Sequence, residues 1–435
     1  MPGPLSQLRR GHEELVLGLL RRHGPLSRGE LGKHCGLSRT TLYDILAELV
    51  ASGAVVAATQ QEAPRGRGRP AETLTLNPDA GQAIGIDFAR RAVHVAAVNV
   101  AHEVVGSASE PHPAGLPWEE RVELAARLVR GLTGAHGGGA LRLGALSAIG
   151  VGVVGPVGGG PKTEDGPGDA RGDGRGDGRG DGCGGNDPRG HERLAGLLRE
   201  RFGVPVLADN NTRLAALAES IWGAATGVED VLYLRLSHGV GGGLVVGGSL
   251  HRGAYGLSGE FGHITVDPAG ARCDCGGTGC LETVASIRAV LDAYRAAGGR
   301  AEDVPELVKA VREGDAVAHR LLRDVGSRVG AVLAALCNAI GPSVVVVGGE
   351  LAEAGAALLD PVGETLGAQI MPVTRDRVSL RRATLGEAAG ALGAIALVLH
   401  ESPLLSRYPA DGDEAERPPA APERAEETMN PGRRR

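Results

Sequence analysis

Residues 259–283 read GEFGHITVDPAGARCDCGGTGCLET and contain the most specific pattern in the chain. One histidine and three cysteines crowd together here, which in a cytosolic protein indicates a metal site before a disulfide. One imidazole and three thiolates form a closed tetrahedral set, typical of structural zinc (Zn²⁺) and without a position for an activated water. The predicted ligands are His263, Cys273, Cys275 and Cys280, and the alternative is a group of ordinary buried thiols.

Strands and helices alternate on both sides of this stretch. Short apolar runs bounded by turn residues predict buried strands, and amphipathic runs predict helices. The predicted strands are 84–88, 93–100, 148–154, 204–207, 231–236, 243–246 and 344–347, and the predicted helices include 117–132 and 212–222. This alternation predicts an α/β body with mixed sheets.

The first 80 residues have a different organisation. A leucine stripe before Gly24 predicts one helix, and Ser27 with Glu30 forms a capping-box pattern at the start of a second helix, 28–35. Ser38 is a candidate cap for a third helix, and strand-like runs follow at 54–59 and 73–76. This order predicts a winged helix-turn-helix.

Polar side chains near the start of the third helix lie where recognition helices meet base edges. The candidates for DNA contact there are Ser38, Arg39, Thr40 and Tyr43. Between the two strands, three arginines alternate with glycine, an arrangement that suits a narrow minor groove. These are Arg65, Arg67 and Arg69. The alternatives are a helical interaction domain that does not contact DNA and a basic linker.

Composition limits the classes of protein that fit. The chain has 435 residues, of which 42% are apolar, enough for a large core, and its net charge of −6 argues against a protein that coats nucleic acid uniformly. Residues 1–80 carry 10 Lys and Arg against 8 Asp and Glu, so the N-terminal segment alone is slightly basic. No apolar run approaches the ~20 residues of a membrane span, and a signal-peptide pattern is absent. We therefore expect a cytoplasmic protein without membrane contact.

Two segments have compositions typical of disorder. Residues 155–190 contain 15 glycines and three tandem Arg-Gly-Asp-Gly units that start at Arg171. The last segment, 401–435, is rich in Pro, Glu and Arg. Such chains bury little apolar surface, so we expect a disordered insert and a disordered tail.

The glycine run at 239–243, the Gly-Glu-Phe-Gly-His motif at 259–263, the three cysteines and Glu282 together resemble the ROK family of sugar kinases and repressors. The resemblance implies a winged helix-turn-helix, 1–80, followed by an actin-like (ribonuclease H-like) two-lobed ROK domain, 81–400. It also implies sugar contacts at Asn210, Asn211, Glu260, His263 and Glu282. His263 would then bind zinc through one ring nitrogen and sugar through the other.

Three departures from the family pattern concern catalysis. The position of the family's catalytic Asp is held by Asn211, and an amide cannot accept a proton. Asp87 of the first phosphate loop is followed by Phe-Ala-Arg-Arg, where the family has Gly-Gly-Thr. The second phosphate loop starts with Ser237-His238, where the family usually has Gly-Thr. We therefore predict no catalytic residues and no enzymatic activity.

The sequence predicts a DNA-binding transcriptional regulator, a sugar-responsive repressor of carbohydrate-related genes. Its expected partners are a double-stranded operator, a sugar or sugar-phosphate effector and further copies of itself, as a homodimer or homotetramer. Two alternatives stay open. One is an ATP-dependent hexose kinase with an added DNA-binding domain, and the other is a ligand-independent regulator that keeps the fold as a scaffold.

Overall fold

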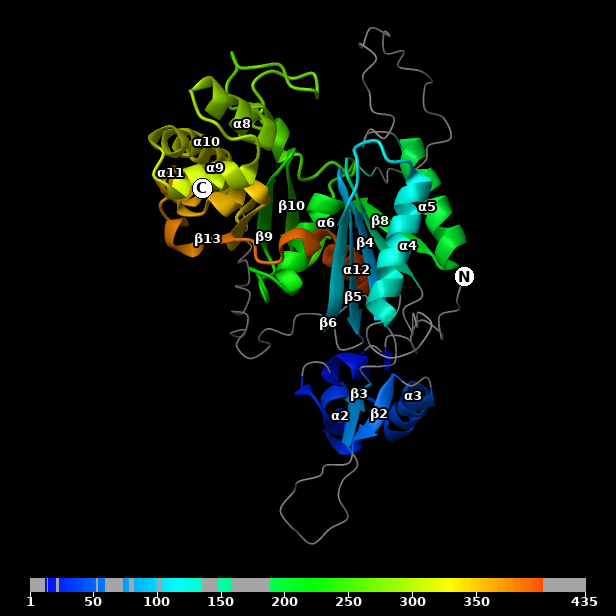
Figure 1. Cartoon of the computed structure of the whole chain (residues 1–435). Helices are drawn as coiled ribbons and strands as arrows, with labels where there is room; N and C mark the ends of the chain where they lie inside the picture. Colours follow the sequence, from blue (N-terminus) through cyan, green and yellow to red (C-terminus); the bar gives the residue numbers. More distant parts are fainter. Residues whose placement is uncertain are drawn as a thin grey trace, which may run out of the picture.

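The computed structural model describes residues 12–13, 15–20, 23–51, 54–58, 73–77, 82–99, 103–134, 148–155, 157 and 188–401. The predicted wing arginines Arg65, Arg67 and Arg69, most of the glycine-rich insert and the C-terminal segment after Glu401 lie outside these residues. Figure 1 shows a small N-terminal domain beneath two larger lobes.

The N-terminal domain has the predicted helix-turn-helix order. Residues 15–20 are helical, and three strands, one before α2 and two after α3, form a sheet of order β1-β3-β2. Its elements are β1 (Leu26–Ser27), α2 (Arg28–Cys35), α3 (Arg39–Ala51), β2 (Val55–Ala58) and β3 (Thr73–Leu76). The capping box is confirmed, because Ser27 accepts from the Glu30 N–H while the Glu30 carboxylate accepts from the Ser27 N–H. Leu31, Ile45 and Leu74 belong to its separate apolar core.

The first lobe is built on a five-stranded sheet of order β6-β5-β4-β7-β8. The strands are β4 (Gln82–Phe88), β5 (Ala92–Asn99), β6 (Val104–Pro111), β7 (Ile149–Val153) and β8 (Val206–Asn210). Helices α4 (Trp118–Gly134) and α5 (Pro188–Phe202) pack on each other, and α4 also contacts β5 and β6. β4, β5 and β6 pair antiparallel, whereas β7 and β8 extend the sheet in parallel.

The second lobe repeats this topology with the order β11-β10-β9-β12-β13. Its strands are β9 (Val231–Leu236), β10 (Val240–Val246), β11 (Ser249–His251), β12 (Val344–Gly348) and β13 (Ser379–Arg382). Its helices are α7 (Glu282–Ala285), α8 (Ile287–Ala296), α9 (Val304–Arg312), α10 (Ala316–Ile340) and α11 (Ala356–Gln369), with short turns η1 (Phe261–His263), η2 (Glu350–Ala354), η3 (Arg375–Arg377) and η4 (Gly386–Ala388). Two lobes with one strand order confirm the actin-like fold class.

Two helices join the lobes, and glycines let them approach closely. α12 (Ala389–Glu401) packs on β4 and β7, α6 (Asn211–Ile221) packs on β10 and β9, and the two helices pack on each other. A Cβ added at Gly150 would lie 1.8 Å from the carbonyl oxygen of Ala394, and one at Gly393 would lie 1.9 Å from that of Leu214. The backbone of β7 therefore contacts the backbone of α12, which in turn contacts the backbone of α6.

Several predicted boundaries move. The strand predicted at 204–207 is instead β8, which runs on to Asn210 because its last residues pair with β7. α5 begins at Pro188, so the last three residues of the predicted insert are helical. The strand predicted to begin at Gly243 is β10, which begins at Val240, because Gly241 and Gly242 also pair with β9.

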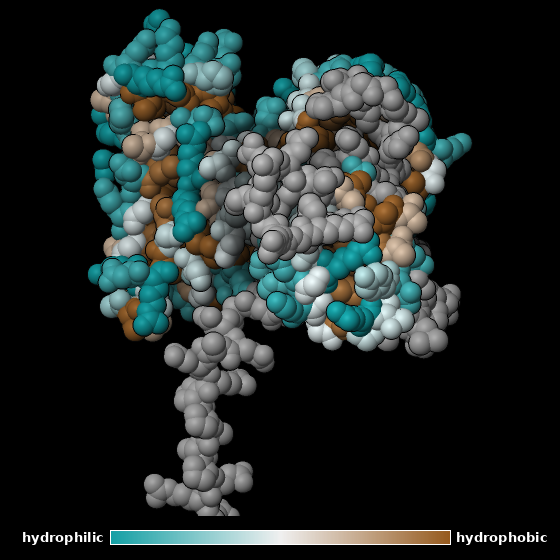
Figure 2. Space-filling view, turned by 90° about the horizontal axis from the view of Figure 1, so that it is seen from below, coloured by the Kyte–Doolittle hydropathy of each residue, from teal (hydrophilic) through white to brown (hydrophobic). Residues whose placement is uncertain are grey.

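No helix among the described residues is long and apolar enough to cross a bilayer. Seen from below, hydrophilic residues cover most of the coloured surface, with apolar residues in smaller areas between them (Figure 2).

We expect Gly150→Ala to lower the free energy of unfolding by about 3 kcal/mol or more, because its methyl group would overlap the α12 backbone. Gly131→Ala, in α4 with nothing within 4 Å of its added Cβ, is the matched control and should stabilise slightly. Urea unfolding of both variants measures the difference. Equal stability would contradict the close packing of α12.

Candidate functional site

The structure brings the four predicted metal ligands together. His263 lies in η1, and the three cysteines follow on a folded loop that ends at α7. One potential ligand atom from each residue lies within 4.8 Å of the other three. Cys275 Sγ and Cys280 Sγ are 3.7 Å apart, and His263 Nδ1 lies 3.6 Å from Cys273 Sγ. A tetrahedral site with metal–sulfur bonds of ~2.3 Å requires sulfurs about 3.8 Å apart, so the arrangement fits a metal ion.

Backbone hydrogen bonds and glycines shape the cysteine loop. The Cys273 N–H donates to Gly277, and the Val266 N–H donates to Gly279. Gly279 has φ +67°, and an added Cβ there would lie 1.5 Å from the Asp267 carbonyl oxygen. Only glycine fits this turn, which directs Cys280 back toward His263.

Two of the three thiols, those of Cys273 and Cys280, resist ionisation when no cation is present. Burial, followed by the neighbouring thiols, raises the pKa of Cys280 to about 12. Burial also raises the pKa of Cys273, whereas the Gly277 N–H lowers the pKa of Cys275. A metal must therefore displace protons on binding, so metal affinity should rise with pH.

His263 connects this cluster to the predicted sugar site. Its Nδ1 faces Cys273, while Nε2 lies 3.9 Å from a Glu260 carboxylate oxygen. That separation is too long for a direct hydrogen bond, but one hydroxyl oxygen can lie about 2.8 Å from both atoms. Both side chains are about one-third exposed. The pair can thus accept a ligand hydroxyl between them.

Glu282, the third of the predicted sugar contacts in this region, begins α7 two residues after Cys280. Its Oε2 accepts a hydrogen bond of 2.8 Å from the Val240 N–H. The cysteine loop therefore links His263 at one end to Glu282 just beyond the other end. One Glu282 oxygen is already used, because it holds the start of β10.

Asn210 and Asn211 use their side chains inside the protein. Asn210 Oδ1 caps α6 by accepting from Thr212 and Arg213, and its Nδ2 donates to the Gly155 carbonyl. Asn211 Nδ2 donates to Asp87 Oδ1 at 3.0 Å. The structure thus places both asparagines at the start of α6, with structural hydrogen bonds that the sequence did not predict.

Asp87 is almost fully buried between Asn211 and two glycines. An added Cβ at Gly390 would lie 2.1 Å from its Oδ2, and one at Gly152 would lie 3.2 Å from its Oδ1. Burial raises the pKa of Asp87, partly offset by His94, Arg235 and the Asn211 hydrogen bond. An amide at position 211 stabilises this carboxylate, whereas a second carboxylate would repel it.

The residues that replace the family's phosphate loops lie on two turns. Arg90 and Arg91 are exposed on the β4–β5 turn, and His238 is exposed on the β9–β10 turn. Burial, then Arg91, Arg90 and Arg235, lowers the pKa of His238, against the raising effect of Glu350. Arginines of the first lobe thus act electrostatically on the second.

In the N-terminal domain, Arg39, Thr40 and Tyr43 are exposed on α3. Tyr43 is 52% exposed, and the Arg28 guanidinium lies 5.1 Å from its ring centroid. The Ser38 hydroxyl is used within the chain, because it accepts from the Thr41 N–H at 3.1 Å. All four predicted contacts are therefore exposed, and the Ser38 hydroxyl also caps the start of α3.

Sequence inspection missed Arg213, a buried guanidinium that binds Asp209 and the Gly256 carbonyl. The signal was present, because Asp209 and Arg213 stand four residues apart and Arg213 is the one cation in the apolar helix α6.

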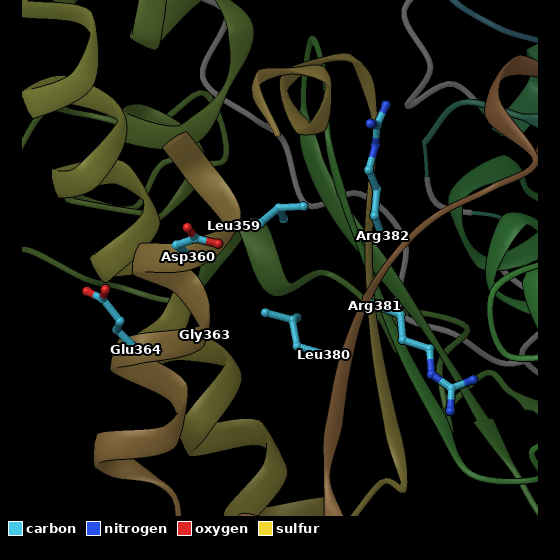
Figure 3. A pocket seen from close by; sticks show the side chains of 7 residues that line it. All are labelled: Leu359, Asp360, Gly363, Glu364, Leu380, Arg381 and Arg382. Atoms are coloured by element: carbon cyan, nitrogen blue, oxygen red, sulfur yellow. The ribbon is translucent and has the colours of Figure 1, made fainter. Parts of the chain in front are cut away.

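A hollow of about 470 Å³ lies elsewhere, between α11 and β13 (Figure 3). It is lined by Leu359, Asp360, Gly363, Glu364, Leu380, Arg381 and Arg382, none of which is a predicted site residue. Three of its charged groups already have partners, since Arg382 pairs with Glu353, Glu364 pairs with Arg323, and Arg381 donates to the Ala224 carbonyl.

A comparison of the sequence with models of known protein families identifies the family of this chain. The ROK family model matches residues 186–401, which include the cluster of His263 and three cysteines and both lobe-joining helices, α6 and α12. The chain belongs to the ROK family.

Relatives within this ROK family fall into two groups. The chain is 26% identical over 407 residues to the DNA-binding transcriptional repressor Mlc of Escherichia coli, covering 91% of this chain and 95% of Mlc. It is 37% identical over 214 residues to a glucokinase of Halalkalibacterium halodurans, covering 45% of this chain but only 64% of the glucokinase. A solved ROK family transcriptional regulator, a homologue of Mlc, has the same fold, with TM-score 0.69, 24% identity and coverage of 90% of this chain and 96% of that chain.

Asn211→Asp should make stability strongly dependent on pH. Two carboxylates would then face each other in a buried site, and one would keep its proton with a raised pKa. A raised native pKa favours the folded state at low pH, so the stability lost relative to wild type should grow as pH rises above about 4, by about 1.4 kcal/mol for each pH unit until the native pKa is reached. Melting temperatures from pH 4 to 8 measure this, and Asn211→Ala, which adds no charge, should show no such trend. A pH-independent loss would contradict the Asp87–Asn211 contact.

Cys280→Ser should reduce bound divalent metal from about one ion per chain to a small fraction, because the site then loses one of its thiolates. Elemental analysis of purified protein measures the metal. Cys35→Ser, in the N-terminal domain, is the control and should leave the content unchanged. Equal metal in both variants would show that the cluster does not bind it.

Proposed function

We propose that this ROK protein is a sugar-responsive DNA-binding transcriptional repressor without kinase activity. Two observations carry the proposal: a small domain with helix-turn-helix order precedes two ROK lobes, and the alignment with the repressor Mlc spans nearly the full length of both proteins. The glucokinase match, by contrast, covers less than half of this chain.

The N-terminal domain supplies DNA recognition in this proposal. Arg39, Thr40 and Tyr43 lie exposed at the start of α3, where an arginine can bind guanine or phosphate and the hydroxyl groups can orient the helix. Arg65, Arg67 and Arg69 would enter the adjacent minor groove. A homodimer or homotetramer would present two such domains to the half-sites of a palindromic operator, and binding to chromosomal DNA implies a cytoplasmic protein.

The effector site of the proposal is the region around Glu260, His263 and Glu282. Carboxylate and imidazole groups suit sugar hydroxyls because they can accept or donate hydrogen bonds. We assign Zn²⁺ to the cluster, with His263 bound through Nδ1 so that Nε2 faces the ligand. The metal supplies no chemistry beyond fixing His263, Glu282 and the loop between them.

The absence of kinase activity is inferred from the Asp87–Asn211 pair. Position 211 carries an amide that donates to Asp87 and cannot accept a proton from a sugar hydroxyl. Loss of a positioned base costs about 10²–10⁴ in rate. A ligand would instead act by preferring one arrangement of the lobes, since it can shift that equilibrium only through its differential affinity.

Fluorescence anisotropy with DNA from the flanks of the protein's own gene tests the proposal. We expect sequence-specific binding that Arg39→Ala weakens about 10–100-fold, because a base contact contributes ~1–3 kcal/mol. Arg295→Ala, which breaks only an exposed ion pair with Asp292 on α8, is the control and should bind normally. Binding that is indifferent to sequence would contradict the repressor role.

The same assay with sugars tests the effector site. A panel of glucose, N-acetylglucosamine, xylose and glucose 6-phosphate should contain one compound that releases the operator, and Glu260→Gln should lower that response without changing DNA affinity in its absence. Coupled ATP turnover over the panel should stay at background. Robust turnover would instead establish the hexose kinase, and specific DNA binding without a sugar response would favour the ligand-independent regulator.

A further inference from the structure

Arg213 is an unusual residue for its location. It lies in the first turn of α6, its side chain is 1% exposed, and nine of the eleven residues of that helix are buried. Arginine is rarely buried so completely unless it is paired. Here Nε donates to Asp209 Oδ1 at 2.8 Å and Nη1 donates to the Gly256 carbonyl. Nη2 lies 2.6 Å from the same Asp209 oxygen, but without a hydrogen-bonding angle.

Asp209 extends this contact to the second lobe. Its other carboxylate oxygen accepts from Arg252 Nε at 2.5 Å, and Oδ1 also accepts from the Asn210 N–H at 2.6 Å. Asp209 belongs to β8 of the first lobe, whereas Arg252 and Gly256 follow β11 of the second. The cluster Asp209, Arg213 and Arg252 therefore ties the two lobes at the start of α6.

The tied segment, 252–259, leads directly into the candidate sugar site. The Ser258 N–H donates back to the Arg252 carbonyl, which closes the loop. Gly259 has φ +100°, and its carbonyl accepts from the N–H groups of Gly242 and Phe261. Glu260 is the next residue, so its position depends on how the loop is held.

Polar anchors, and not apolar burial, hold this loop. Its two large apolar residues face solvent, with Tyr255 78% exposed and Leu257 50% exposed. A loop that buries so little surface would otherwise open easily. The contacts of Arg213 and Arg252 therefore order it together with the backbone hydrogen bonds of Ser258 and Gly259.

We propose that Arg213 is a positioning residue that holds the start of α6, where Asn210 and Asn211 lie, at a fixed separation from the loop that carries Glu260 and His263 of the candidate sugar site. Burying an ion pair costs desolvation, and replacing such a pair by neutral residues is often harmless to stability. The contribution of Arg213 here is geometric: by holding the loop 252–259, it sets the position of Glu260. The effect on sugar affinity rests on the proposed function, whereas the effect on the loop does not.

Two variants separate geometry from stability. Arg213→Met combined with Asp209→Asn removes the tie and leaves no unpaired buried charge, while the amide oxygen at 209 still accepts from Asn210. Arg213→Lys keeps a cation beside Asp209 but cannot also reach Gly256 with the planar fork of arginine. Arg295→Met is the control, because it removes an arginine from an exposed pair on α8.

Hydrogen exchange of the full-length protein measures the loop. We expect exchange in residues 252–263 of the double variant to accelerate about tenfold or more, as follows from losing hydrogen bonds to charged groups, with β12 unchanged and metal retained. Arg213→Lys should be intermediate, and Arg295→Met should match wild type. The proposal would be overturned if the loop of the double variant exchanged at the wild-type rate. It would also be overturned if exchange in β12 accelerated as much as exchange in the loop.

Calorimetry with glucose, N-acetylglucosamine, xylose and glucose 6-phosphate measures the site. For the compound that wild type binds, the double variant should lose about tenfold or more in affinity while operator binding without sugar is unchanged. Unchanged sugar affinity would overturn the positioning role. If wild type binds none of the four, the effector part of the proposed function fails, and hydrogen exchange alone decides whether Arg213 holds the loop.

Discussion

The contact between His263 Nδ1 and the three-cysteine cluster is the constraint on which the candidate ligand site depends. The segment from His263 to Cys280 has little regular secondary structure: its strand pairing is limited to two isolated bridges, and backbone hydrogen bonds hold its turns. A metal ion at the cluster would fix both ends of that segment. It would thereby position His263 and Glu282, which are the two side chains that flank the loop in sequence, and turn Nε2 of the imidazole toward Glu260.

A second constraint acts at the start of α6. The amide of Asn211 satisfies a buried carboxylate, Asp87, that lies against glycines of β7 and α12. The same fold built with two carboxylates at these positions would need a proton or a cation between them. The amide removes that need, so the site can be stable without a nucleotide and its metal. In the proposed function, this amide is one of the side chains that separate ligand recognition from phosphoryl transfer.

Local sequence patterns predicted much of this molecule. The capping box at Ser27, the strands at 73–76 and 231–236 and the family of the chain all follow from short-range chemistry or from a motif. Boundaries failed where pairing partners decide them: Asn210 is the end of a strand because β7 lies beside it, and Gly241 and Gly242 belong to a strand because they pair with β9. The Arg213 cluster joins residues up to 43 positions apart, so no local pattern could reveal its contact with Gly256.

Zinc K-edge X-ray absorption of the purified full-length protein measures the His263 constraint most directly. The expected spectrum contains three sulfur ligands at ~2.3 Å and one nitrogen ligand at ~2.0 Å, and it should not change when a sugar binds, because the ligand would contact the other ring nitrogen. A shell of oxygen and nitrogen alone, or a nitrogen ligand that disappears on sugar binding, would contradict a metal that orients His263 toward the ligand.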